Sequence, residues 1–337
     1  MSGVERRALL GAALGAALLA ALFASLRGPA LADVLRHAAL GPLSVVVLVT
    51  FGAYGTRAWR FGFLLAPLAR VPFRRLLAAT YLGYMAGLFV PRVGELLRPW
   101  LVGRRHAIPT SAAFASIVLE RVFDVVAVLA LAGACLLQSG AGRHLDPEWR
   151  GRLLIGSLSA GLAALAALST LVALHARPEP ALRLLGVLLR AVPARLASAI
   201  LTGVGSFVSG LAVLRASLVH LLVIAGQSLL VWTFIATGVY ASNQAFGIEL
   251  PFRAAFVVLA FVLVGVTVPT PGAVGGFHAA YVLALTGLYG VDRERAAAAA
   301  LACHGLTSLA VLVVGLAFLP GEGLTFRQVT RLPDRAD

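Results

Sequence analysis

The sequence predicts an all-α integral membrane protein, with six full transmembrane helices and two re-entrant helical hairpins that enter the membrane from opposite sides. The composition is the first observation behind this prediction, because 60% of the 337 residues are hydrophobic and only 12% are charged. Such a composition is typical of a polytopic membrane protein. The lengths of the apolar runs and the placement of the arginines supply the other two observations.

Six apolar runs are long enough, or nearly so, to cross about 30 Å of hydrocarbon as helices. These runs are residues 8–26, 41–56, 111–138, 153–174, 217–241 and 296–319. The first run resembles the apolar part of a signal peptide, since Ala30 and Ala32 form a cleavage-like site after it. Its apolar stretch is longer than usual for a signal peptide, however, and Arg27 separates it from that site. We therefore expect an uncleaved first helix.

Two shorter apolar runs, 76–90 and 252–268, are interrupted by proline and glycine. If both of them crossed the membrane, the segment that holds Arg98, Arg104 and Arg105 would lie outside, and so would the connection 176–215. Cytoplasmic loops carry the excess of arginine in most membrane proteins, so this arrangement would be the reverse of the usual one.

A re-entrant arrangement, in which each short run enters the membrane and returns to the same side, restores the usual orientation. The arginine-rich segments that then become cytoplasmic are 57–75, 176–215 and the tail 321–337. We therefore predict one hairpin over 76–103 that enters from the cytoplasm, and a second over 252–290 that enters from the opposite side. Both termini are expected to be cytoplasmic.

Proline and glycine mark the turns of the two predicted hairpins. The first turn is "FVPRVGE", with Pro91 and Gly94, and the second is "VPTPGAVGGFH". The residues that break the second helix are Pro269, Pro271, Gly272, Gly275 and Gly276. Broken helices at corresponding places in two halves of a membrane protein indicate a transport site, because freed backbone groups can hold a polar group there. Irregular backbone at that depth must be buried in protein or line a wet cavity.

Charged residues cluster on two of the predicted elements. Glu120, Arg121 and Asp124 form one stripe of the helix that starts near Thr110, about 15–21 Å from that end. On the returning half of the first hairpin, charges recur every three residues at Arg92, Glu95 and Arg98. A lone charge at the centre of a membrane helix costs about 2.5–3.5 kcal/mol on insertion scales. We therefore expect these six residues to pair with each other or to face water.

Two interpretations of this charged cluster stay open. In the first, it is a structural cluster of salt bridges that fixes the hairpin against the helix 111–138. In the second, it is a functional site in a polar cavity. We favour the second, because buried ion pairs contribute little net stability and intramembrane ionisable residues are most often functional.

Other polar residues are predicted to be structural. Arg57 and Arg60 in "TRAWRFG" are expected to anchor the end of a span at the membrane surface, with Trp59 in the interfacial belt. Cys135 and Cys303 lie in apolar runs without metal-ligand spacing, so we expect packing residues, no metal and no cofactor. The net charge of +14 comes wholly from arginine, which indicates membrane orientation and not nucleic-acid binding.

Four motifs in order carry a family resemblance over about residues 8 to 320. They are "RAWR", "PRVGELLRP", "ERVFD" and "PTPGAVGGFH" followed by "LTGLYGV". The chain resembles the flippase-like membrane family defined by the transmembrane region of lysylphosphatidylglycerol synthases. This resemblance implies a single membrane domain over 1–337, in the inner membrane of a bacterium, that moves lipids between leaflets. Because the chain ends at Asp337, we expect a stand-alone member without the aminoacyl-transfer domain.

The chain departs from the family pattern at two positions. The glycine-rich turn of the family commonly ends in a glutamate and the following helix carries an arginine, whereas His278 and His304 stand at the corresponding places here. Counting along the helix from Arg295 places His304 about 13 Å deep, near the level of the turn, so the two histidines are expected to approach one another. They are either a core pair or a proton-binding pair that couples transport to pH.

The predicted function is lipid transport between leaflets, with a phosphate or other polar head group passing through a site near the middle of the membrane. The candidate substrate-binding residues are Arg92, Glu95, Arg98, Glu120, Arg121, Asp124, Pro271, Gly272, Gly275, Gly276, His278 and His304. The arginines are suited to hold a phosphate. The competing functions are a non-transporting scaffold for an envelope-lipid synthase and a membrane-embedded lipid-modifying enzyme. An envelope-lipid biosynthetic enzyme and a second copy of the chain are candidate partners.

Overall fold

The computed structural model describes residues 17, 20, 28–138 and 147–330, and every regular element in this part of the chain is a helix. Most of the first predicted span, 8–26, and the end of the tail lie outside the described residues. The α-helices are α2 (Gly28–Arg36), α3 (Leu40–Leu65), α4 (Phe73–Phe89), α5 (Val93–His106), α6 (Thr110–Gln138), α7 (Pro147–Ala176), α8 (Pro178–Leu188), α9 (Ala194–Gly210), α10 (Leu218–Ala245), α11 (Phe252–Gly265), α12 (Gly276–Tyr289), α13 (Arg293–Glu322) and α14 (Phe326–Thr330). Short 3₁₀ turns are η2 (Leu189–Ala191), η3 (Leu211–Arg215) and η4 (Pro271–Ala273).

Six helical segments in the described part are long and apolar enough to cross a membrane. They are Leu40–Leu65, Leu158–Ala176, Ala194–Arg215, Leu218–Ala245, Pro271–Tyr289 and Arg293–Glu322. Four of them coincide with predicted spans, whereas Ala194–Arg215 and Pro271–Tyr289 were not expected as spans. The predicted span 111–138 is one continuous helix, α6, which has three charged residues in its first half.

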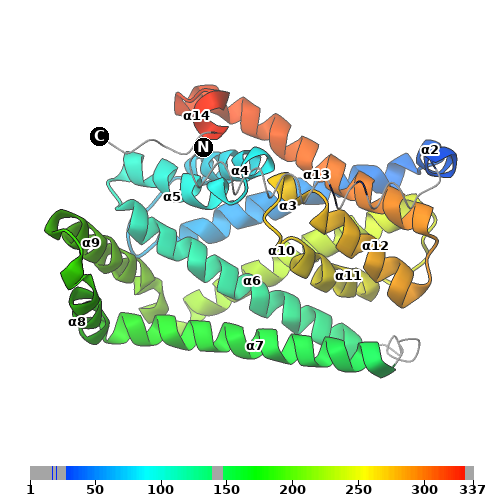
Figure 1. Cartoon of the computed structure of the whole chain (residues 1–337). Helices are drawn as coiled ribbons and strands as arrows, with labels where there is room; N and C mark the ends of the chain where they lie inside the picture. The colour runs from blue at the N-terminus through cyan, green and yellow to red at the C-terminus, as the bar shows by residue number, and fades with distance from the viewer. Residues whose placement is uncertain (1–16, 18–19, 21–27, 139–146, 331–337) are drawn as a thin grey trace.

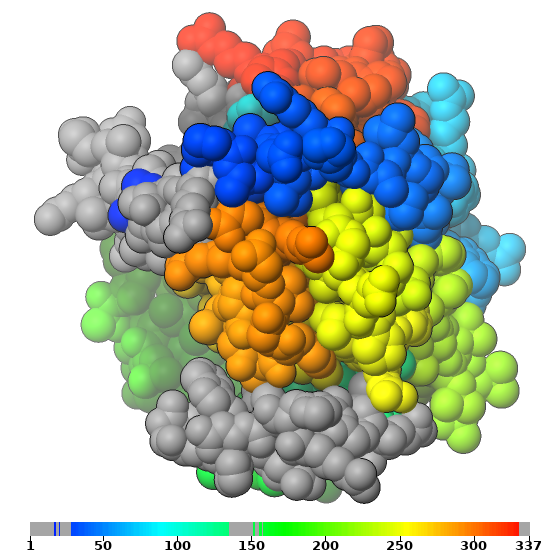
Figure 2. Space-filling model, turned by 90° about the vertical axis from the view of Figure 1, so that its right-hand side faces the viewer, coloured from blue at the N-terminus to red at the C-terminus, as the bar shows by residue number. Residues whose placement is uncertain are grey.

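The long helices lie side by side, with α7 along one edge (Figure 1). The connections α3–α4, α5–α6, α7–α8 and α9–α10 lie toward one end of the bundle, and this is where the arginine-rich segments fall. The opposite end faces the viewer in Figure 2, where α2, the start of α3 and parts of α10–α13 are visible. Two predictions about the first end need correction. Residues 57–65 belong to α3 and not to a loop, and most of the connection 176–215 is helical.

Two helical hairpins occupy the regions where the sequence predicts them. The first is α4–α5, broken at residues 90–92, and the second is α11–α12, broken at 266–275. In the first break, Arg92 adopts a left-handed backbone with a φ angle of 63°. In the second, Gly272 and Gly275 have φ angles of 60° and 91°, which glycine adopts without steric cost.

A pair of glycines holds the two helices of each hairpin close together. A Cβ atom added to Gly94 of α5 would overlap the carbonyl oxygen of Gly83 in α4. In the second hairpin, a Cβ atom on Gly276 would overlap the carbonyl oxygen of Gly265. Small residues let helix backbones approach closely, and packing between helices in a membrane depends on such contacts. The backbones of both hairpins therefore touch at one crossing point each.

The helix contacts follow a two-fold pattern in which α3, α4, α5 and α6 correspond to α10, α11, α12 and α13. The first hairpin packs against α3, α6 and, from the other half, α13. The second hairpin packs in the same way against α10, α13 and, from the other half, α6. The extensive contact between α3 and α10 joins the halves. The two turns also meet, because Gly272 lies against the backbone of Leu88 at the end of α4.

Candidate functional site

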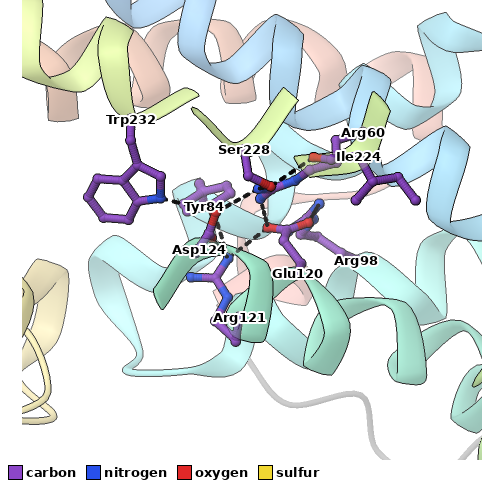
Figure 3. A network of polar contacts seen from close by, with 9 residues as sticks. All are labelled: Arg60, Tyr84, Arg98, Glu120, Arg121, Asp124, Ile224, Ser228 and Trp232. Carbon is purple, nitrogen blue, oxygen red and sulfur yellow. Dashed lines mark hydrogen bonds and ion pairs between the residues drawn. The ribbon is translucent and has the colours of Figure 1, made fainter. Parts of the chain in front are cut away.

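A buried network of ion pairs lies where α3, α5 and α6 meet (Figure 3). Glu120 is fully buried and accepts two parallel hydrogen bonds from Arg98, at 3.0 and 3.1 Å between nitrogen and oxygen. Its Oε1 atom also lies 2.7 Å from Nη2 of Arg121 and 3.3 Å from Nη2 of Arg60. One carboxylate thus contacts three guanidinium groups.

Asp124, one turn further along α6, extends the network to α10. Its Oδ1 atom accepts a hydrogen bond of 2.6 Å from Arg60 and one of 3.2 Å from the indole nitrogen of Trp232. Arg60 also donates to the hydroxyl of Ser228 at 2.7 Å. Because Ser228 and Trp232 are four residues apart on α10, both reach the network from one face of that helix. The polar network therefore joins the two halves of the bundle.

The expectation that Arg60 anchors a span at the membrane surface is wrong. Its side chain is completely buried and bonds to both acids of α6. The physical reason is that α3 continues as a helix to Leu65, so Arg60 lies within the helix and faces α6 and α10. Arg57 is also buried, one turn earlier. The apolar stretch "FGFLLA" after Arg60 is the signal that would have indicated this continuation. Trp59 is half exposed on the same helix.

The six charged residues singled out from the sequence do not all meet. Arg98, Glu120, Arg121 and Asp124 are brought together, and Arg60 joins them. Arg92 is exposed and Glu95 is half-buried, and neither has an ion-pair partner in the part of the chain that the structure describes. The first turn of α5 therefore points Arg92 and Glu95 away from the network and toward the cavity described next.

A cavity of about 400 Å³ opens between the two hairpins. Its polar lining includes Arg57, Tyr84, Arg92, Glu95, Arg98 and Arg121 on one side and Thr270, His304, Thr307 and Ser308 on the other. Its apolar lining comes mainly from α11 and the second turn, with residues such as Leu259, Val262 and Val268. Cavities of this size are usual for small-molecule sites, and a few polar groups on an apolar wall suit an amphiphilic ligand.

The predicted binding residues of the second turn, and His304 of α13, differ in whether they line this cavity. Gly272 and His304 line it, whereas Gly276 lies at the crossing of α11 and α12 and Gly275 precedes α12. Pro271 begins the short turn η4. Gly276 is thus a packing residue of the hairpin and does not line the cavity.

His278 and His304 approach one another as the sequence indicates. The centres of their rings lie 4.8 Å apart, and the ring of Phe277 lies 4.6 Å from that of His304. His278 is buried, and its Nδ1 atom is 3.5 Å from the backbone nitrogen of Gly275. The contact joins α12 to α13. A second cavity, of about 150 Å³, lies on the other side of Arg57 and His304, which line both cavities.

Glu322 forms a second charged cluster at the end of α13. This buried carboxylate lies 2.6 Å from Arg75 of α4 and 2.9 Å from Arg105 of α5. Arg104 donates to the backbone oxygen of Glu322 at 2.7 Å. These contacts tie the open end of the first hairpin to the last long helix. The described residues contain no group of histidine, cysteine and acidic side chains that would hold a metal ion, and Cys303 is a buried free thiol.

Comparison with known proteins gives one match over most of the chain and one short match. The family model described as "Lysylphosphatidylglycerol synthase TM region" matches residues 8–315. The glycosyltransferase AglD of Haloferax volcanii is 36% identical over 72 residues, which are 21% of this chain. The match spans only 12% of the length of that curated protein.

Proposed function

Because the chain belongs to the family of the lysylphosphatidylglycerol synthase transmembrane region, we propose that it moves a lipid between the two leaflets of a membrane. The observation that carries this proposal is the cavity between the hairpins, with arginines on one wall and apolar residues of α11 and the second turn on another. A polar head group must be held by charged or hydrogen-bonding groups to pass through hydrocarbon, while its chains can stay in an apolar environment. The cavity offers both kinds of surface.

The transport path we propose is formed by re-entrant hairpins. Two features support it: the two-fold pattern of the helix contacts, and the gathering of the arginine-rich connections at one end of the bundle. A hairpin of each half then reaches the cavity from opposite sides, as in transporters built from inverted repeats. The end with the arginine-rich connections is the cytoplasmic one.

Labelling of single cysteines tests the re-entrant arrangement. In a background without Cys135 and Cys303, cysteines at Arg74 and Ala107, which flank the first hairpin, should react with an impermeant reagent from the same side. Cysteines at Glu249 and Arg293, which flank the second hairpin, should react from the opposite side. All four positions are exposed, or at a helix end, in the structure. If the two ends of either hairpin label from different sides, that hairpin crosses the membrane.

Replacement of Arg98 by lysine tests whether the arginine wall takes part in transport. Arg98 donates two parallel hydrogen bonds to Glu120. A lysine keeps the positive charge but cannot make this paired contact. One charge-assisted hydrogen bond contributes about 1.5–3 kcal/mol, so we expect transport to fall by about tenfold or more. The measurement is the movement of fluorescent phosphatidylglycerol in proteoliposomes, with Arg183→Lys on the exposed face of α8 as the control. Normal transport by a folded Arg98→Lys protein would show that transport does not depend on the paired hydrogen bonds of Arg98.

The same assay separates transport from the two competing functions. A scaffold would move no lipid when it is the only protein in the liposome. A lipid-modifying enzyme would change the mass of the lipid, which mass spectrometry of the recovered probe would detect. The short match to a glycosyltransferase motivates that second measurement, although the matched part is a small share of that protein.

A further inference from the structure

The wall of the large cavity has more positive than negative charge. Among the described residues that line it, the arginines are Arg57, Arg92, Arg98 and Arg121, and the one acid is Glu95. Glu120 and Asp124 lie behind the wall, where Arg60 also contacts them. Five arginines and three carboxylates thus lie in or behind this wall, and the formal excess is two positive charges.

Arg57 accounts for one of these charges. Only 9% of its surface is exposed, and no carboxylate in the described part of the chain lies within 4.0 Å of its guanidinium group. The guanidinium carbon lies over two aromatic rings instead, 5.2 Å from the centre of Tyr54 and 4.8 Å from that of Tyr84. Its Nε atom is buried without a hydrogen-bond acceptor. Arg57 is thus a buried cation that packs against aromatic rings and makes no ion pair with a described carboxylate.

The two buried carboxylates of the network already contact other arginines. Glu120 already contacts three arginines and Asp124 contacts two. The Nε atoms of Arg60 and Arg98 also lack acceptors. Among the buried atoms of this network, several guanidinium nitrogens have no acceptor. One carboxylate oxygen, Oδ2 of Asp124, has no donor, so the donors are in excess. The cavity therefore offers guanidinium donors and a net positive charge to a ligand.

Resting on the proposed transport function, we propose that the cavity selects phospholipids whose head group has a net negative charge, and that Arg57 is a ligand of the phosphate. A phosphate has several acceptor oxygens, which suit guanidinium donors. A head group with an added ammonium would place that cation among the arginines, with Glu95 as the one acid on the wall. Like charges placed together at a binding surface weaken binding strongly. We therefore expect aminoacylated head groups to bind more weakly than anionic ones.

The test compares three lipids with the same fluorescent chain in proteoliposomes: phosphatidylglycerol, phosphatidylcholine and lysylphosphatidylglycerol. We expect phosphatidylglycerol to move about tenfold faster than the zwitterionic lipid, and the cationic lipid to be slower still. Equal rates for all three would leave transport intact and overturn the charge selection. A wild-type protein that moves none of them would overturn transport.

A binding measurement decides the proposal independently of transport. Phosphatidylglycerol should raise the thermal unfolding midpoint of the protein in detergent, and lysylphosphatidylglycerol should not. An equal rise with both lipids would overturn the selection even if nothing is moved. An equal rise with inorganic phosphate alone would assign the site to a free ion and would also overturn it.

Arg57→Gln tests the role of this residue in the same two assays. We expect the variant to lose the preference for phosphatidylglycerol, whereas Arg183→Gln on the exposed face of α8 should keep it. Because Arg57 is not within ion-pair distance of any described acid, its removal leaves no buried carboxylate unpaired. A folded Arg57→Gln protein with unchanged lipid preference would overturn the assignment of Arg57.

Discussion

Replacement of Arg60 by methionine should destabilise the protein by about 3–5 kcal/mol, the loss usual when one partner of a buried ion pair is removed. Arg60 is fully buried and contacts both Glu120 and Asp124, in addition to Ser228. Methionine fills much of the same volume, so the expected loss comes from the carboxylates left with fewer partners and not from a cavity. The measurement is thermal unfolding in detergent, together with the yield of inserted protein.

Two further variants separate this electrostatic cause from general damage. Arg183→Met changes an exposed arginine on α8 and should leave stability within about 0.5 kcal/mol of the wild type. The double variant Arg60→Met with Asp124→Asn should recover part of the loss, because the asparagine carries no charge and its oxygen still accepts from Trp232. If Arg60→Met alone unfolds at the wild-type temperature, the network does not depend on Arg60.

Replacement of Gly94 by alanine should separate the two helices of the first hairpin. The added Cβ atom would overlap a backbone oxygen of Gly83, and backbone cannot rotate away as a side chain can. Forcing an extra carbon into a packed contact costs about 1–3 kcal/mol and occasionally more. We expect the upper part of that range, measured as the free energy of unfolding in detergent. Gly276→Ala should have a similar effect on the second hairpin, where the oxygen of Gly265 occupies the space.

Gly87→Ala is the matched control for stability, since it lies on α4 and an added Cβ atom would meet nothing within 4 Å. Alanine stabilises a helix by about 0.5–1 kcal/mol relative to glycine, so this variant should be as stable as the wild type or slightly more so. Gly94→Ala with unchanged stability would show that α4 and α5 do not cross at the distance the structure gives.

The sequence alone predicted the helical class, the breaks of two helices and the family. The break at Pro91 and the one at "PTPGAVGG" follow from local rules, since proline and glycine act on the backbone of their own and adjacent residues. The shared face of Glu120 and Asp124 follows equally from helical spacing over four residues. His278 and His304 were expected to approach because both could be counted from fixed points along helices.

The tertiary structure decided which charges meet. Arg60 and Asp124 are separated by 64 residues, and Arg60 and Ser228 by 168, so no local spacing connects them. Conversely, Arg92 and Glu95 have the same spacing as Glu95 and Arg98, yet Arg98 alone of the three turns toward Glu120. The end of α3 was also misjudged, because two arginines in an apolar run look like the boundary of a span when their partners are unknown.

The sequence by itself determined the helical class, the places where two helices break and that the chain lies in a membrane, because hydropathy and backbone preference act within a few residues. Only the tertiary structure decided that Arg60 completes a buried network while Arg57 has no acid beside it. The reason is that the energy of a charge in an apolar bundle depends on groups brought within a few ångströms by other helices. That proximity depends on how α3, α6 and α10 pack together.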